Sequence, residues 1–194
     1  MKAAVLIDGG HLRVIVRNAN KNYNPDYIEK IALACVHPNE TLFRIYYYDC
    51  PPYNGTTTLP VSGNPTTFKG TDTWLRSLAK KEYFAVRLGV LKFRGFKPKR
   101  VPITPTALTD ADFAPDFEQK GVDMRIGLDI ATFCNTKAVE RIVLITNDTD
   151  CIPAMKHARI AGLQVVLIGL PGHRAAPELL HHADFHRTLL AWPL

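Results

Sequence analysis

Short apolar runs alternate with amphipathic segments along almost the whole chain. Continuous apolar runs predict strands in the interior of a sheet, at residues 3–7, 141–145 and 163–168. Weaker β-type patterns predict further strands at residues 41–49, 84–93 and 185–190, the last two nearer a sheet edge. Apolar residues three or four positions apart predict helices at residues 11–20, 24–36, 72–82, 120–135, 152–161 and 176–183. Strands that alternate with helices predict one domain, residues 1–194, with a mainly parallel central sheet in a three-layer α/β/α sandwich.

Two segments interrupt this alternation. Residues 51–65 are rich in Gly, Pro, Asn and Thr and predict a surface loop, for which a functional flap and a disordered insertion both stay open. Residues 101–118 contain three prolines and four acids and predict an irregular excursion. No linker divides the chain, because strands on both sides of these segments are needed to complete one sheet.

Composition narrows the class of protein. The 194 residues are 46% hydrophobic and 22% charged, which is typical of a globular chain, and no apolar run approaches the roughly 18 residues of a membrane helix. Four widely spaced cysteines form no CxxC pair, so we expect reduced thiols in a cytoplasmic protein. The net charge of +6 is compatible with an anionic partner such as nucleic acid, and a homo-oligomer is equally compatible with the sequence.

Carboxylates follow the predicted strands at the ends where ligands bind. Asp8 ends the first apolar run and precedes two glycines, and Asp148 and Asp150 follow the run at residues 141–145. The carboxyl ends of parallel strands share one edge of a sheet, which is where open α/β sheets bind ligands. Asp123 falls in the first turn of the helix at residues 120–135, at its positive end. Helix capping is the simpler explanation for Asp148 or Asp150 taken alone.

Several carboxylates at one edge imply a cation. Two carboxylates a few Å apart repel by about 4 kcal/mol at an effective dielectric near 20. Oxygen ligands favour Mg²⁺ or Mn²⁺ over zinc, and such an ion can activate water and clamp a scissile phosphodiester. Asp129 lies on another side of the helix from Asp123 but is close enough in sequence to reach the rim of such a pocket.

A basic segment interleaved with aromatic residues predicts contact with nucleic acid. Its basic members are Lys92, Arg94, Lys97, Lys99 and Arg100. Cationic side chains neutralise phosphates, and the intervening Phe93 and Phe96 offer faces for base stacking. The alternative is a solvated strand end whose phenylalanines belong to the core. A second cluster, His181, His182 and His186, reads more simply as a helix surface than as a zinc site.

Three motifs in order resemble one known family. They are Ile7-Asp8-Gly9-Gly10-His11-Leu12, then Lys120-Gly121-Val122-Asp123, then Thr146-Asn147-Asp148-Thr149-Asp150 followed by Gly162-Leu163-Gln164-Val165. Together they resemble the LabA-like NYN domain family of PIN-like metal-dependent ribonucleases. The resemblance implies a PIN-like, Rossmann-like fold and hydrolysis of RNA by metal-activated water. It implies that Asp8, Asp123 and Asp148 coordinate the metal and that Asp150 completes the pocket.

The chain departs from the family pattern at three positions. His11 stands where the family often has Asn, and Thr146-Asn147 replaces the usual Ser-Gly. Because these residues flank the acids, we assign His11, Thr146 and Asn147 to substrate binding, together with the five basic residues of the segment that begins at Lys92.

Three other functions are alternatives to a metal-dependent ribonuclease. A non-catalytic module of the same fold would bind RNA or protein and act as a regulator. A phosphatase with an Asp nucleophile is disfavoured, because its Asp-x-Asp pair follows the first strand, whereas here the pair follows a late one. The sequence supports a dinucleotide-binding protein even less, because Asp8-Gly9-Gly10 lacks the G-x-G-x-x-G pattern.

Overall fold

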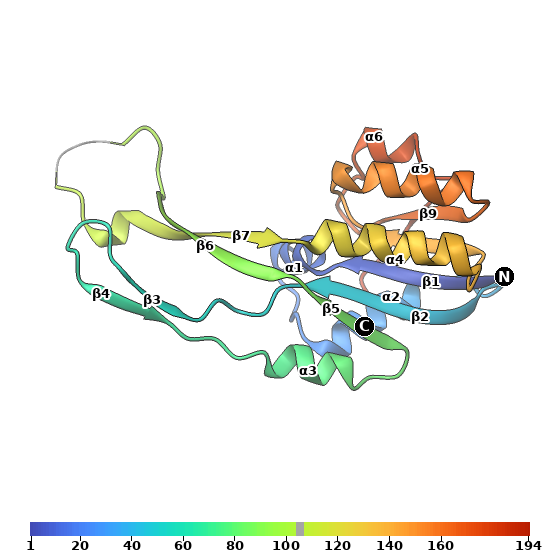
Figure 1. The fold of residues 1–194 in the computed structure, drawn as a ribbon, viewed down its shortest axis with the longest axis horizontal. Helices are drawn as coiled ribbons and strands as arrows, with labels where there is room; N and C mark the ends of the chain where they lie inside the picture. Colours follow the sequence, from blue (N-terminus) through green and yellow to red (C-terminus); the bar gives the residue numbers. More distant parts are fainter. Residues whose placement is uncertain (104–106) are drawn as a thin grey trace.

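A six-stranded sheet forms the centre of the molecule. In this computed structural model, which describes residues 1–103 and 107–194, the strand order is β10-β9-β8-β1-β2-β5 and every pairing is parallel (Figure 1). The strands are β1 (Lys2–Asp8), β2 (Thr41–Asp49), β5 (Phe84–Leu88), β8 (Arg141–Ile145), β9 (Gln164–Gly169) and β10 (Phe185–Thr188). The predicted parallel sheet is therefore confirmed, with β1 near its middle.

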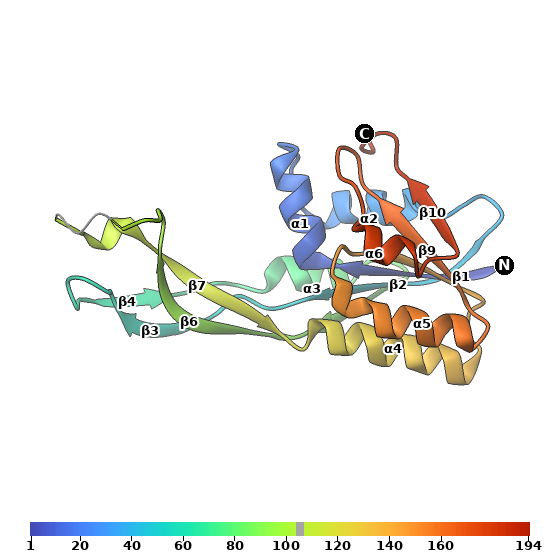
Figure 2. The same ribbon diagram turned by 90° about the horizontal axis from the view of Figure 1, so that it is seen from above.

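Helices cover both faces of the sheet, so the predicted three-layer sandwich is also confirmed (Figure 2). One face carries α1 (Gly9–Asn18), α2 (Pro25–Ala34) and α3 (Thr73–Ala79), and the other carries α4 (Val122–Thr136), α5 (Ile152–Ile160) and α6 (Pro177–Leu180). Successive side chains of β1 point to opposite faces, so Val5 and Ile7 pack with α1–α3 while Ala4 and Leu6 pack with α4 and α5. No helix among the described residues is both long and apolar enough to cross a membrane.

Two antiparallel hairpins project from this body and form an arm (Figures 1 and 2). One hairpin pairs β3 (Gly55–Thr58) with β4 (Pro65–Phe68), and the other pairs β6 (Val90–Pro98) with β7 (Phe113–Lys120). Near the outer end, the carboxylate of Asp110 in the short 3-10 helix Asp110–Asp112 accepts hydrogen bonds from the backbone N–H groups of Val61 and Ser62. The arm, which comprises residues 51–70, 90–103 and 107–120, is thus a unit in which the two hairpins support each other.

Three predictions for this region were wrong. Residues 51–65 contain strand β3 and the start of β4 instead of a loop, and residues 101–118 contain most of strand β7, although residues 104–106 lie outside the described part. The strand predicted at residues 84–93 is two strands, because the chain leaves the main sheet at Gly89. A Cβ atom at Gly89 would lie 2.5 Å from the carbonyl oxygen of Lys120, so only glycine permits this crossing.

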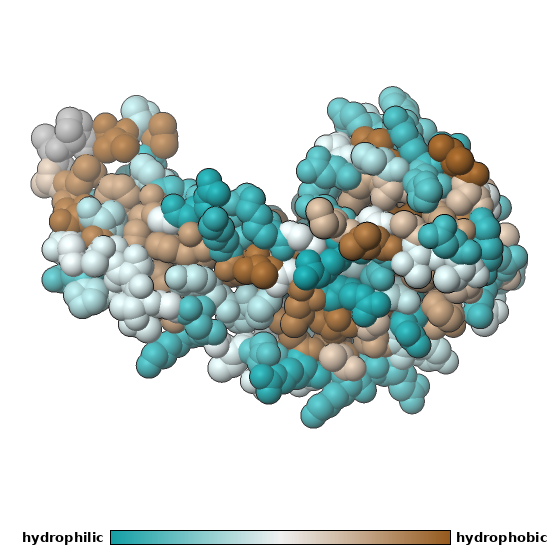
Figure 3. Space-filling view, in the orientation of Figure 1, coloured by the Kyte–Doolittle hydropathy of each residue, from teal (hydrophilic) through white to brown (hydrophobic). Residues whose placement is uncertain are grey.

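An aromatic cluster holds the arm together. Phe93 packs against Phe96, Phe117, Phe68 and Tyr53, with ring centroids 5.3–5.7 Å apart. These rings come from both hairpins and from the segment before β3, so their burial fastens one hairpin to the other. Figure 3 shows hydrophobic residues along the arm and at its outer end.

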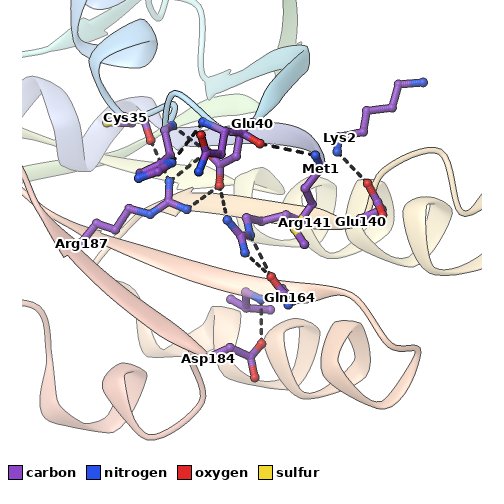
Figure 4. Close-up of polar contacts among 12 residues, drawn as sticks. Met1, Lys2, Cys35, Glu40, Glu140, Arg141, Gln164, Asp184 and Arg187 are labelled. Atoms are coloured by element: carbon purple, nitrogen blue, oxygen red, sulfur yellow. Dashed lines mark hydrogen bonds and ion pairs between the residues drawn. The ribbon is translucent and has the colours of Figure 1, made fainter.

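A buried ion pair network closes the opposite, amino edge of the sheet (Figure 4). The Glu40 carboxylate, with its side chain 1% exposed, contacts the guanidinium groups of Arg141 and Arg187 and accepts the backbone N–H of His37 at 2.7 Å. It joins the segment before β2 to strands β8 and β10. All four cysteines are free and buried, as predicted.

Candidate metal centre

The predicted acids meet at the carboxyl edge of the sheet. Asp8 ends β1, Asp148 follows β8, and Asp150 lies in the 3-10 turn Thr149–Cys151 that precedes α5. Asp123 enters from the first turn of α4. Asp123, Asp148 and Asp150 each offer one oxygen atom, and these atoms lie within 4.8 Å of one another. Among the described residues this is the one such group close enough to share a metal ion.

Thr146 links Asp8 to Asp148. Asp8 is 8% exposed; its Oδ1 accepts the backbone N–H of His11 at 3.0 Å, and its Oδ2 accepts the Thr146 hydroxyl at 3.3 Å. The same hydroxyl oxygen accepts the backbone N–H of Asp148 at 3.1 Å. Thr146 is 2% exposed. Through these two hydrogen bonds it orients Asp8 at the end of β1 and Asp148 after β8. Its predicted contact with substrate stays a prediction, which this burial does not favour.

Asp148 is both a cap and a member of the acidic group. Its Oδ1 accepts the backbone N–H of Asp150 at 2.9 Å, which is a capping hydrogen bond for the 3-10 turn. Only one of its two oxygens is used in this way. The helix-cap interpretation and the metal-site interpretation therefore apply to the same side chain.

The electrostatics of the group favour a bound cation. Burial, reinforced by Asp148, raises the pKa of Asp8 despite the hydrogen bonds from His11 and Thr146. Burial, Asp148 and Asp8 together raise the pKa of Asp123. In the described part of the chain, none of the four carboxylates forms an ion pair with a basic side chain. Within the described residues, this negative charge is offset by hydrogen bonds and by the positive end of α4, and not by a cationic side chain.

The donor set consists of oxygen atoms. Cys151 lies beneath the acids, and burial together with Asp123 and Asp148 raises the pKa of its thiol to about 12. A thiol that stays protonated at neutral pH is a poor metal ligand, since the thiolate is the ligand form. Carboxylates alone fit a hard cation such as Mg²⁺ or Mn²⁺.

His11 and Asn147 border the acids at an open hollow of about 510 Å³, whose lining includes Asp8, Gln119 and Asp148. Burial, with a smaller effect of His173, lowers the pKa of His11, so its imidazole is neutral at pH 7. The Asn147 Oδ1 accepts the backbone N–H of Ala176 at 2.6 Å, which leaves its amide Nδ2 available to a ligand.

Three further residues, at this hollow or at a pocket that adjoins it, belong to no motif recognised in the sequence. Gln119 lies near the end of strand β7, just before α4, and lines the hollow beside Asp8. His173 and Arg174, in the segment after β9, line a small adjoining pocket with His11 and Asn147. The position of His173 and Arg174 just after a predicted parallel strand is a signal that sequence reasoning could have used.

The basic residues of the arm extend away from the acids. Lys92 lies near the base of the arm, whereas Lys97, Lys99 and Arg100 lie toward its outer end, because β6 runs outward from Val90. The eight residues of β7 span roughly 24–27 Å. Two of the basic side chains are paired across the hairpin: Arg94 with Glu118 at 2.9 Å, and Lys97 with Asp116 at 2.7 Å. Phe93 and Phe96 belong to the aromatic cluster of the arm and to neither of the hydrophobic clusters that flank the main sheet.

Two other sequence-based predictions were wrong. Asp129 does not reach the rim of the acidic group, because its carboxylate accepts the Tyr48 hydroxyl at 2.9 Å and pairs with Arg87 at 3.0 Å. The helix surface predicted for the histidine cluster that begins at His181 is wrong, because α6 ends at Leu180, His181 and His182 follow it in a turn, and His186 lies in β10.

Comparisons with known proteins place the fold in a family. A sequence model of the NYN domain matches residues 2–190. The protein belongs to the NYN domain family. NYN domains share the PIN-like nuclease fold, and they are generally ribonuclease-type hydrolases. The parallel sheet of this NYN domain also matches a crystal structure of a Vibrio parahaemolyticus protein of unknown function. That match has 15% identity and a TM-score of 0.57, and it covers 100% of this chain and 95% of the other. No curated protein matches the chain.

Proposed function

We propose that this NYN domain is a Mg²⁺- or Mn²⁺-dependent endoribonuclease of the LabA-like branch. One observation carries the proposal: Asp123, Asp148 and Asp150 converge to within 4.8 Å beside the buried Asp8, with no basic partner among the described residues. Like charges at this spacing are costly unless a cation joins them. The carboxyl edge of a parallel sheet is also the expected place for a substrate.

A divalent cation held by the four carboxylates would supply an activated water and neutralise charge on the phosphate. The chain's own residues prepare the site for this chemistry. Hydrogen bonds from His11 and Thr146 fix the rotamer of Asp8, and the positive end of α4 stabilises anions near Asp123. The carboxylates are therefore oriented before a ligand arrives, which reduces the reorganisation that binding costs.

The neutral His11 and the amide of Asn147 are proposed to bind the phosphodiester. Both line the hollow beside the acids, and each has a nitrogen that can donate a hydrogen bond. Arg174 is exposed next to them and is proposed to add a charged contact to the phosphate backbone. The five basic residues from Lys92 to Arg100 are proposed to hold more distant phosphates along the arm.

We expect the protein to cleave single-stranded RNA when Mg²⁺ or Mn²⁺ is present and to lose this activity in EDTA. The same ions should raise the melting temperature, because a ligand that binds only the folded state stabilises it by about 2.7 kcal/mol at a hundredfold excess over its dissociation constant. Gel analysis of labelled RNA and thermal melts at matched ionic strength measure the two effects. Absence of any metal-dependent stabilisation would contradict a metal site built from these acids.

The arm should contribute to the salt dependence of RNA binding. The triple variant Lys97→Ala, Lys99→Ala, Arg100→Ala is expected to reduce the log–log slope by about 2, since each contact with single-stranded nucleic acid contributes about 0.7. Fluorescence anisotropy at several salt concentrations in EDTA gives the slope. A control that replaces three exposed lysines on the body, Lys21, Lys80 and Lys156, should leave it unchanged. Equal slopes for both triples would remove the outer arm from the binding site.

A non-catalytic module that binds RNA or protein is the second candidate. The observation in its favour is the exposed Asn147, whose side chain is tied to Ala176 at the edge of the hollow where the resembling family usually has glycine. This function predicts RNA binding in EDTA and no cleavage under any metal condition, so the cleavage assay separates the two candidates.

A further inference from the structure

A second hollow lies where the arm joins the body. Its volume is about 300 Å³, and its walls include Arg13 from α1, Tyr53 before β3, Phe68 and Lys69 at the end of β4, Trp74 from α3 and Phe117 from β7. We call this hollow the junction pocket. It lies outside the acidic group, and no predicted site residue lines it.

The walls of the junction pocket are aromatic and held in place. The Trp74 ring meets Tyr23 and Tyr47 edge-on, each with centroids 6.0 Å apart. Tyr53 stacks on Phe93 at 5.7 Å, and Phe68 packs against Phe117 at 5.5 Å. Because neighbouring rings fix these side chains, the pocket does not need to form when a ligand arrives. Flat apolar walls of this kind fit a planar aromatic group.

Two cations border the same pocket. The Arg13 side chain is 26% exposed, and its guanidinium pairs with the buried carboxylate of Asp49, at 2.5 Å from Oδ1. Lys69 is exposed and forms no ion pair with a described residue. An aromatic slot beside two cations matches a nucleotide, whose base stacks while its phosphate meets the positive charge. A purely apolar ligand would not use Arg13 or Lys69.

Two hydrogen bonds connect the junction pocket to the hollow at the acids. Asp49 Oδ1 accepts both from Arg13 and from Gln119 Nε2, the latter at 3.1 Å. Gln119 also lines the hollow at the acids, where a Cβ atom on Gly10 would lie 2.7 Å from its Oε1. The Asp49 carboxylate thus links Arg13, which lines the junction pocket, to Gln119, which lines the hollow at the acids. A single strand with a phosphate at the acids can place a nearby base in the junction pocket.

We infer that the junction pocket binds an unstacked base of single-stranded RNA that flanks the phosphate at the metal centre. This inference rests on the proposed function for the identity of the ligand. It adds a site that selects single strands, because a paired base in a duplex cannot enter a slot between aromatic walls.

The first test uses the fluorescence of Trp74. The chain has two tryptophans, and the Trp192→Phe variant leaves Trp74 as the only one, since Trp192 packs on Tyr27 instead of the pocket. In EDTA, octa-uridylate is expected to quench Trp74 emission saturably, whereas inorganic tripolyphosphate, which has charge but no base, should not. RNA that binds by anisotropy without quenching Trp74 would overturn the inference. Quenching by a tyrosine-rich peptide and not by RNA would assign the pocket to a protein partner and would overturn it too.

The second test uses affinity. Trp74→Leu should weaken octa-uridylate binding by roughly fivefold to 150-fold, the range of one lost base stack, while Trp74→Phe should keep most of the affinity. Lys69→Ala, which removes no packing, should weaken binding a few-fold, and Lys80→Ala, an exposed lysine on the same side of the body, should not. Wild-type affinity in both Trp74→Leu and Lys69→Ala would refute the pocket.

Different experimental results would refute the nuclease proposal and the junction-pocket proposal. Quenching and weakened binding without any metal-dependent cleavage would refute the nuclease and leave the junction pocket standing. Cleavage with no quenching and no effect of Lys69→Ala would refute the junction pocket alone.

Discussion

Asp148→Asn is expected to lower the rate of RNA cleavage by about two orders of magnitude or more and to stabilise the metal-free protein. The substitution keeps the shape of the side chain, and its amide oxygen can still accept the N–H of Asp150. What it removes is one negative charge from the acidic group. Loss of a group that fixes charge at a reaction centre costs about 10²–10³ in rate. Relief of repulsion should add on the order of 1 kcal/mol to the metal-free stability after solvent screening.

The raised pKa values of Asp8 and Asp123 explain why Asp148→Asn should stabilise the metal-free protein instead of destabilising it. A carboxylate whose folded pKa lies above its unfolded value makes folding less favourable once it is ionised, so the wild type holds this cost at neutral pH. Mn²⁺ should stabilise Asp148→Asn much less than the wild type. Glu82→Gln, which removes an exposed acid between α3 and β5, is the matched control and should change neither property. Cleavage by Asp148→Asn at the wild-type rate, or a lower melting temperature in EDTA, would sink the metal-site proposal.

Glu40→Gln is expected to be the most destabilising single change at the amino edge of the sheet, by about 3–5 kcal/mol. Its carboxylate is 1% exposed and faces two guanidinium groups, from Arg141 and Arg187. An amide cannot neutralise either one, so two cations would stay in a partly buried site without a counter-charge. Urea denaturation at pH 7 measures the loss. Glu140→Gln is the matched control, because Glu140 is exposed and its carboxylate accepts, among the described residues, only the backbone N–H of Lys2 at 2.8 Å (Figure 4).

The same network gives stability a pH dependence. The Arg187 and Arg141 guanidinium groups, with the N–H of His37, outweigh burial and lower the pKa of Glu40 to about 2. Because the folded pKa lies below the unfolded value near 4.5, the stabilisation is present above about pH 4.5 and is lost as the pH falls toward 2. The shift corresponds to about 3 kcal/mol. A Glu40→Gln protein should therefore lose less stability than the wild type between pH 5 and pH 2, and an equal loss would contradict this account.

The sheet and the acids were predictable because their signals are local. Each central strand is a continuous apolar run, and its polar end residue must lie at the carboxyl edge of a parallel sheet. That rule alone brings Asp8 near Asp148, although they are 140 positions apart in the sequence. The rule does not show how Asp8 and Asp148 are joined. The Thr146 hydroxyl that links them became visible only with the geometry of both strand ends.

The arm was not predictable for the opposite reason. Strand β3 is made of Gly and Thr, and β7 contains a proline and two acids, so neither has the apolar alternation that announces a strand. Their stability comes from rings supplied by separate segments, such as Tyr53 and Phe117, which no spacing rule brings together. The junction pocket was hidden for the same reason. It is composed of side chains from α1, β4, α3 and β7 whose proximity depends on how the arm leaves the body.

The place of β1 in the sheet has a consequence for the synthesis of the protein. β1 comes first in the sequence among the strands of this sheet, yet one of its two neighbours is β8, with Ala3 opposite Arg141. A ribosome must therefore complete about three quarters of the chain before Asp8 can meet Thr146 and Asp148. Contacts of such long sequence separation form late and slowly. A nascent chain that ends before Asp148 therefore lacks the assembled acidic group, and any activity of that group begins only after the strands on both sides of β1 have been made.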